Sequence, residues 1–397
     1  MSLLRHPALR RILPGLLVSA LGDGMSLVAV AWLAVSIAPP SGAGVWVGLS
    51  VAAYALPATL GAALLARRMR ALRAARLVEA DAWLRAITLG TVAFLAVTGA
   101  LSPVAYVVLL ALSSLLHAWG NAGAYTLIAE LLPPDQRLAG NALLSTFTQA
   151  AIVVGPALAG VLAALLGPGW VIGIDALSFA FLAISSRWVP TGPPPPAPET
   201  GGWRTILDRP QLLGLIVVTG VFFFLYGPVE VALPVHIAED LSGSARLLGL
   251  YWTVFGVGAT VGAISAAALK NRPPWLVVVA IIIGWGAALL PLGLTEAILP
   301  GLLGLAVGGL IYGPFNAIAT ALFQRASPPE VLSRVLATRA ALTIPATSLG
   351  TLLGGPLVTA IGARPTLLAS ALLTIALGVA VAVALFARRR AAPSRPG

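Results

Sequence analysis

Long apolar stretches alternate with short polar connections along the whole chain. A helix needs about 20 mostly apolar residues to cross the hydrocarbon core of a bilayer. Twelve stretches reach that length, with the approximate ranges 12–38, 44–66, 76–99, 103–128, 141–165, 168–189, 212–238, 245–269, 275–294, 298–324, 336–361 and 364–386. The pattern predicts an all-α membrane protein with twelve transmembrane helices.

The composition also indicates a membrane-embedded chain. Of the 397 residues, 59% are hydrophobic and only 9% are charged, whereas a soluble domain carries about 25% charged residues. The first apolar stretch is too long for the h-region of a signal peptide, so we interpret it as a spanning helix. The chain contains no cysteine, which excludes disulfides, thiolate metal ligands and cysteine nucleophiles.

The net charge of +11 comes from basic residues at the ends of the apolar stretches. One alternating set of connections holds almost all of these residues, and the opposite set holds only Arg246 and Arg364. Cytoplasmic loops of membrane proteins are enriched in lysine and arginine. We therefore predict that both termini are cytoplasmic, which requires an even number of spans. The same placement accounts for the charge without a nucleic-acid partner.

A proline-rich connection, residues 190–211, follows the sixth predicted span and divides the spans into six plus six. Its polyproline character prevents it from forming a core. We predict an N-terminal six-helix bundle over 1–189, a cytoplasmic linker over 190–211, and a C-terminal six-helix bundle with a short basic tail over 212–397.

The two predicted bundles share sequence. GLSVAAYALPATLGA (48–62) matches GLYWTVFGVGATVGA (249–263) at an offset of 201. A second offset, of 195, pairs Asn121 with Asn316, Gly155 with Gly350, and Gly160 with Gly355. Because both halves start on the same side, they are parallel repeats about an axis normal to the membrane.

With this architecture the chain resembles transporters of the major facilitator superfamily over nearly its whole length. The stretch ELLPPDQRLAGNALLSTFTQAAIVVGPALAGVLAALLG (130–167) is similar to the bacterial multidrug and siderophore exporter branch. The resemblance implies a secondary transporter that binds its substrate near the midplane and works by alternating access. A family motif between spans two and three keeps Gly61 and its basic cluster here but lacks its acid, which puts the cytoplasmic latch of the family in doubt.

The resemblance also bears on the glycines and proline of the fifth predicted span. Members of the branch carry G-x-x-x-G-P-x-x-G-G; Gly155, Pro156 and Gly160 match it, and two of its glycines are alanines here. Small residues let helices approach closely in lipid. We predict a packing and gating role for these residues and for the repeat-related Gly350 and Gly355. The alternative is ordinary packing within one half.

Two acids lie inside predicted spans, where ionisable groups are costly and usually functional. Asp23 stands about twelve residues into the first span, near mid-membrane at about 1.5 Å per residue, and shares a small, polar face with Ser19 and Ser26. We predict a cavity wall there, with Asp23 and Glu230 as proton-coupling candidates. The alternative for each is a structural hydrogen bond, and Glu230 could also belong to an outer gate.

Polar residues recur at every fourth position in the fourth and tenth predicted spans. Such stripes avoid lipid, so both are predicted to face protein or a substrate cavity; their candidate members are His117, Asn121 and Tyr125 in the fourth span, and Tyr312, Asn316, Thr320 and Gln324 in the tenth. In the third span, Asp81 and Arg85 are four residues apart, a spacing that favours a structural ion pair within one helix.

Enzyme chemistry has little support, because the three histidines lie in separate segments and no metal-ligand spacing or nucleotide-binding loop stands out. We therefore predict no cofactor and no metal, and transport driven by a gradient. The sequence favours a monomeric, proton-coupled exporter of small amphipathic or lipophilic molecules in the bacterial plasma membrane. The alternatives are a nutrient importer of the same fold, and a membrane sensor or assembly factor that does not transport.

Overall fold

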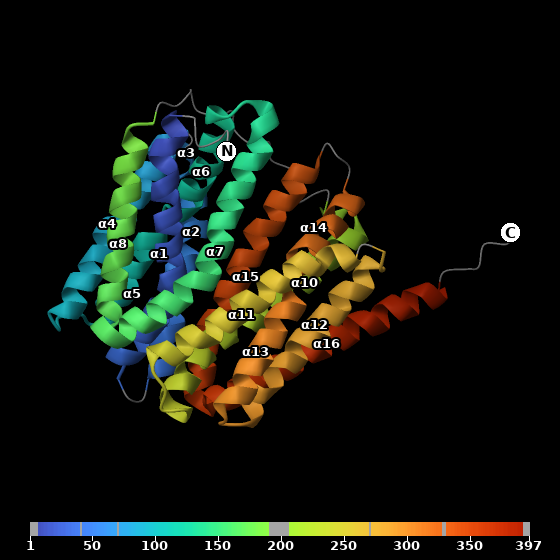
Figure 1. Cartoon of the computed structure of the whole chain (residues 1–397). Coiled ribbons are helices and arrows are strands. Elements are labelled where there is room, and N and C mark those ends of the chain that lie inside the picture. Colours follow the sequence, from blue (N-terminus) through green and yellow to red (C-terminus); the bar gives the residue numbers. More distant parts are fainter. Residues whose placement is uncertain are drawn as a thin grey trace. The chain divides into compact units, whose positions relative to one another are not determined.

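The computed structural model describes residues 7–39, 42–69, 71–189, 206–269, 271–327 and 331–391. Helices account for the regular secondary structure of these residues, and they contain no strand (Figure 1). Twelve helical segments are long and apolar enough to cross a membrane: Ala8–Ile37, Ala43–Leu64, Ala74–Val97, Pro103–Leu131, Pro134–Leu166, Pro168–Arg187, Pro210–Asp240, Ala245–Leu269, Pro274–Leu294, Ile298–Ala326, Thr338–Ile361 and Ala363–Ala387. The prediction of an all-α protein with twelve spans is confirmed.

The main deviation from the predicted ranges is at the start of the fifth span. The sequence places this start near residue 141, but the helix begins at Pro134. Proline is well suited to the first turn of a helix, since its missing N–H has no intrahelical partner there. The first two turns are polar, so the helix is longer than its apolar portion.

The chain forms two compact units, which do not divide it at a single point. Unit 1 contains Met1–Pro198 and Leu233–Thr253, and unit 2 contains Glu199–Ala232 and Val254–Gly397. The end of α10 (Pro210–Val235) and the start of α11 (Ala245–Ser265) therefore belong to unit 1. The predicted bundle boundaries stay a prediction, and positions 190–205 of the predicted linker lie outside the described residues.

Unit 1 is built around the long helix α1, which packs against α7 and α8, while α8 also packs against α4 (Figure 1). The other helices of the N-terminal segment pack beside these four. The bounds are α1 (Pro7–Ile37), α2 (Ala43–Leu64), α3 (Ala66–Met69), α4 (Ala74–Val97), α5 (Pro103–Ser114), α6 (His117–Leu131), α7 (Pro134–Leu166) and α8 (Pro168–Arg187).

Unit 2 has α12 at its centre, in contact with α13, α14 and α16, while α15 packs against α14 and α16. These helices are α12 (Pro274–Leu294), α13 (Ile298–Tyr312), α14 (Phe315–Ala326), α15 (Leu332–Ile361) and α16 (Ala363–Ala391). In both units many exposed side chains are leucine, isoleucine, valine or phenylalanine, as expected for surfaces that face lipid rather than water.

Glycine contacts bring the first and fifth spans of each half close together. A Cβ built at Gly155 on α7 would lie only 2.6 Å from the Cα of Gly24 on α1. In unit 2, a Cβ at Gly350 would lie 3.2 Å from the Cα of Gly227. Gly155 and Gly350 are the residues that the offset of 195 pairs, so the sequence repeat corresponds to a repeated helix contact.

The second glycine of the fifth-span motif has a different neighbour. A Cβ at Gly160 would lie 3.0 Å from the backbone oxygen of Ala245 and 3.2 Å from the Cα of Gly249, both on the part of α11 that belongs to unit 1. Pro156 lies inside α7 and is buried, and Gly355 is buried in α15. These residues pack closely, and their gating role stays a prediction.

Candidate functional site

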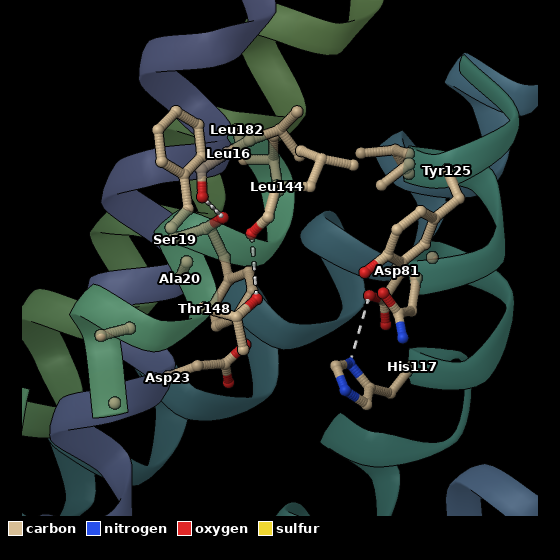
Figure 2. Close-up of a pocket in the computed structure, with 18 of the residues that line it drawn as sticks. Leu16, Ser19, Ala20, Asp23, Asp81, His117, Tyr125, Leu144, Thr148 and Leu182 are labelled. Carbon is tan, nitrogen blue, oxygen red and sulfur yellow. Dashed lines mark hydrogen bonds and ion pairs between the residues drawn. The ribbon is translucent and has the colours of Figure 1, made fainter. Parts of the chain in front are cut away.

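A cavity of about 430 Å³ opens inside unit 1, between α1, α4, α6, α7 and α8 (Figure 2). Its wall is mostly apolar. Five predicted candidates line it: Ser19, Asp23, His117, Asn121 and Tyr125. In Figure 2, Asp23 projects from one wall, and His117, Asp81 and Tyr125 lie together on the other. The structure thus brings the polar face of the first span and the stripe of the fourth span to one cavity.

Asp23 is held by two side chains from neighbouring helices. Arg85 on α4 donates a hydrogen bond from Nη1 to Asp23 Oδ1 at 2.6 Å, and the Tyr54 hydroxyl on α2 donates to the same oxygen at 2.9 Å. The Arg85 side chain is 1% exposed and that of Asp23 is 35% exposed. The ion pair therefore joins α1 to α4, with the acid at the cavity and the base in the core.

The Arg85 guanidinium is also stacked between aromatic rings. Its central carbon lies 4.6 Å from the ring centroid of Phe179 on α8 and 5.1 Å from that of Tyr54. Such cation–π contacts are worth about 0.5–2 kcal/mol each, with the higher values where the cation is desolvated. The two rings and Asp23 together hold a buried cation in one orientation.

The expected ion pair between Asp81 and Arg85 is replaced in the structure by the pair between Arg85 and Asp23. The physical reason is helix packing: Arg85 extends toward α1 and α8, whereas Asp81 lies against Gly120 of α6. A Cβ at Gly120 would lie 2.6 Å from Asp81 Cγ. The i,i+4 spacing could not reveal that an acid from another helix would be nearer.

Asp81 faces His117 of α6 across a gap. Its Oδ2 lies 3.8 Å from His117 Nδ1, which is too long for a hydrogen bond. The other carboxylate oxygen, Oδ1, and His117 Nδ1 are both buried without a hydrogen-bond partner. Asp81, predicted as structural, therefore lines the cavity, while its unsatisfied oxygen Oδ1 is enclosed by the surrounding protein.

Ser26, predicted to line the substrate cavity, is instead in the core of unit 1. Its hydroxyl donates to Asp175 Oδ2 of α8 at 2.5 Å, and the Ser178 hydroxyl lies 3.2 Å from Asp175 Oδ1. Both Ser26 and Asp175 are buried. Sequence reasoning did not assign Tyr54 or Asp175 to this site; the signal for each was a lone polar residue inside an apolar stretch.

In unit 2, Glu230 accepts a hydrogen bond of 3.1 Å from the Thr351 hydroxyl of α15. Two residues of the tenth-span stripe lie near Arg339 of α15: its Nη1 donates to Thr320 Oγ1 at 2.9 Å, and its Nη2 is 3.5 Å from Asn316 Oδ1.

The other two members of the stripe have different surroundings. Tyr312 stacks within a group of aromatic rings, with its centroid 5.8 Å from Phe315 and 5.9 Å from Trp285 and Phe255. Gln324 is exposed. The substrate role of the tenth-span stripe stays a prediction.

Comparison of the sequence with known proteins identifies a family of transporters. The family model of the Major Facilitator Superfamily matches residues 12–343 and 215–397. The multidrug efflux pump Tap of Mycobacterium bovis is 29% identical over 409 residues, covering 95% of this chain and 93% of the pump. The enterobactin exporter EntS of Citrobacter koseri is 30% identical over 229 residues, covering 55% of this chain and 53% of the exporter.

Solved structures match over a similar extent. A bacterial homologue of the iron transporter ferroportin, in an inward-facing state, aligns with a TM-score of 0.70 at 19% identity, covering 96% of this chain and 99% of that one. The nucleoside transporter NupG aligns with a TM-score of 0.72 at 13% identity, covering 95% of this chain and 98% of that one. At such identities these structures show the fold alone.

Proposed function

The chain belongs to the Major Facilitator Superfamily, and from this premise we propose that it exports small amphipathic or lipophilic molecules in exchange for protons, by alternating access. Its relatives are transporters, and it is a transporter rather than an enzyme, a multi-pass protein of the bacterial inner membrane. Cytoplasmic termini and a monomeric state are part of the proposal.

One observation carries the proposal: a mostly apolar cavity of about 430 Å³ has an ion pair in its wall. Apolar pockets of about 300–1,000 Å³ with a few polar groups are typical of sites for small molecules. A charged pair in a membrane interior is costly and marks a functional position. The export direction and the drug- or siderophore-like substrate class are supported by the similarity to the multidrug efflux pump Tap and the enterobactin exporter EntS.

The ion pair between Asp23 and Arg85 is the coupling element of this proposal. Proton binding to Asp23 would neutralise the one carboxylate that forms an ion pair with Arg85 among the described residues. The link between α1 and α4 would then weaken, while Arg85 would keep its aromatic contacts. We propose Asp23 as the main proton-coupling acid and Glu230, held by a single hydroxyl of Thr351, as a second one in unit 2.

A resistance screen tests the export function. The gene is expressed in an efflux-deficient bacterial host, and susceptibility to a panel of drugs and release of a siderophore are compared with an empty vector. We expect lower susceptibility to one or more amphipathic compounds, or increased siderophore release. Inward accumulation of a labelled sugar or amino acid instead would identify an importer. Binding without flux in proteoliposomes would identify a sensor.

Proteoliposomes with an imposed pH gradient test the coupling, using a compound found in the screen. We expect Asp23→Asn to abolish flux driven by the pH gradient while the compound still binds, and Glu230→Gln to reduce flux less. Asp135→Asn is the matched control, because Asp135 is an exposed acid outside the cavity. Normal proton-driven flux in the Asp23/Glu230 double variant would exclude coupling through these two carboxylates.

A further inference from the structure

We propose that a groove between α1 and α8 of unit 1 binds one anionic phospholipid, with the phosphate at Arg11 and an acyl chain along Phe181 and Ile184. The groove is separate from the cavity that contains Asp23, since the two have no lining residue in common. The inference therefore concerns the lipid around the protein and does not depend on which molecule is transported.

The groove has a cation on one side and mostly apolar side chains on the other. Its volume is about 410 Å³. Arg11, in the second turn of α1, forms one side, and the end of α8 forms the other with Phe181, Ile184, Ser185 and Trp188. The two helices lie side by side (Figure 1). They approach closely beside Ser185, because a Cβ built at Gly15 would lie 3.1 Å from the Cα of Leu182.

The exposed side of α8 places this groove at a membrane surface. Exposed apolar side chains recur every three or four residues along it: Trp170, Ile174, Leu177, Phe181, Ile184 and Trp188. From the first tryptophan to the last, the helix rises about 27 Å at about 1.5 Å per residue, close to the hydrocarbon thickness of about 30 Å. Tryptophan is enriched at both membrane surfaces, so Trp188 and the groove lie where head groups meet acyl chains.

The charge of the groove selects an anionic head group. At this end of unit 1, Arg76 and Arg187 both pair with Glu79. Arg11 is exposed, and its side chain takes part in no ion pair or hydrogen bond within the described part of the chain. A guanidinium can bind phosphate through two parallel N–H groups, and basic pockets between transmembrane helices bind anionic lipid head groups. Arg11 is therefore a free cation in the position of a phosphate ligand.

A zwitterionic lipid fits this groove less well. Phosphatidylcholine carries the same phosphate, but its choline cation would lie near Arg11 and the exposed Arg10. The five lining residues include no acid that could hold the choline. Like charges would therefore oppose binding, whereas the uncharged glycerol of phosphatidylglycerol would not. The groove should prefer phosphatidylglycerol over phosphatidylcholine.

The apolar side of the groove distinguishes a lipid from a soluble anion. Phe181, Ile184 and Trp188 are exposed and follow one another along the same face of α8. An acyl chain can cover this face from the head-group level toward the membrane core, and burial of apolar surface stabilises such contacts where the alternative is water or a loose detergent layer. Inorganic phosphate would contact Arg11 alone. We therefore expect the groove to bind the lipid and not the free ion.

The test measures lipid binding to the purified, delipidated full-length protein in detergent by native mass spectrometry. The probes are dioleoylphosphatidylglycerol and dioleoylphosphatidylcholine, which have identical acyl chains. We expect the first phosphatidylglycerol to bind at least about fivefold more tightly than phosphatidylcholine, the order expected for one basic residue at a membrane surface. A large excess of inorganic phosphate should not displace it. Equal affinities for the two lipids, or displacement by phosphate, would overturn the proposal.

Two arginine variants compare the groove with the general surface charge. Arg11→Gln should weaken phosphatidylglycerol binding about fivefold and leave phosphatidylcholine binding within about twofold of the wild type. Arg10→Gln is the matched control: it removes the same charge from the neighbouring position of α1, outside the groove, and should change either affinity less than about twofold. Arg11→Lys keeps the charge and should retain the preference. Equal weakening by Arg10→Gln and Arg11→Gln would show that no specific site exists.

Photo-crosslinking locates the lipid without any substitution. A phosphatidylglycerol with a diazirine on its acyl chain is crosslinked to the wild type, and the labelled peptides are identified by mass spectrometry. We expect labelling of the stretch from Phe181 to Trp188 that excess unlabelled phosphatidylglycerol suppresses and excess phosphatidylcholine does not. Absence of this label, equal suppression by both lipids, or protection of the stretch by a second copy of the chain in a dimer would overturn the proposal.

Discussion

The ion pair between Asp23 and Arg85 should contribute measurably to folding stability. Replacing Asp23 should lower the free energy of unfolding more than replacing Arg85. In Asp23→Asn, the Arg85 cation stays in the core at 1% exposure without its carboxylate. Removing one partner of a buried pair costs about 3–5 kcal/mol. Asp23 is 35% exposed, which weakens the interaction through solvent screening, and asparagine keeps an oxygen that can accept from Arg85. We therefore expect a loss of about 2–3 kcal/mol.

A double-mutant cycle separates the pair from the other contacts of the two residues. Arg85→Met removes the buried cation and leaves a carboxylate that water can reach, so we expect a smaller loss, about 1 kcal/mol, mainly from the aromatic contacts. The double variant Asp23→Asn/Arg85→Met has no uncompensated charge. Its stability should lie within about 1 kcal/mol of that of Arg85→Met alone, which gives a coupling energy in the range of about 1–4 kcal/mol.

The assay is unfolding by sodium dodecyl sulfate in mixed micelles, followed by the fluorescence of the ten tryptophans. Free energies of unfolding are compared for the wild type, the two single variants, the double variant and Asp135→Asn. A loss below about 0.5 kcal/mol in Asp23→Asn, the range of an ordinary surface substitution, would refute the argument. So would strict additivity of the two single variants, because it would mean that the side chains do not interact.

Three further predictions test topology and packing. In the cysteine-free chain, Ala71→Cys should react with a membrane-impermeant thiol reagent only from the cytoplasm and Ala100→Cys only from outside; labelling from the same side would contradict the alternating topology. Gly155→Ala should lower the free energy of unfolding by about 1–3 kcal/mol through overpacking. The control is Gly220→Ala, where an added Cβ meets nothing within 4 Å, and it should be neutral or slightly stabilising. Equal effects of the two substitutions on the free energy of unfolding would contradict the close contact of α1 and α7. Trp119→Phe should cost about 0.5–1.5 kcal/mol, since its indole N–H donates at 3.1 Å to a backbone oxygen of α2, and an unchanged unfolding midpoint would argue against that bond.

The number and type of elements could be predicted from the sequence because the solvent constrains them strongly. In lipid every backbone N–H and C=O must be satisfied within the segment, so a long apolar stretch has to be a helix. The twelve spans follow from that rule alone. The exact start of a helix does not, as at Pro134, because the polar first turns of α7 are outside the apolar signal that the rule detects.

The sequence also indicated which faces would meet a cavity. The spacing of Ser19 and Asp23 on the first span, and of His117, Asn121 and Tyr125 on the fourth, follows from helical periodicity, and all five line the cavity of unit 1. A polar stripe must avoid lipid, so its direction could be inferred without a structure. The orientation of the termini and the bundle boundaries stay predictions of the sequence.

Only the tertiary structure decided the pairing of charges. Helical spacing relates Asp81 to Arg85, but the packing of α1 against α8 and of α8 against α4 brings Asp23 to Arg85, 62 residues away along the chain. It also brings Ser26 to Asp175, at a separation of 149 residues. Spacing along one helix reports on neighbours within that helix, whereas a buried charge is stabilised by the closest complementary group in space, and that group is determined by which helices pack together.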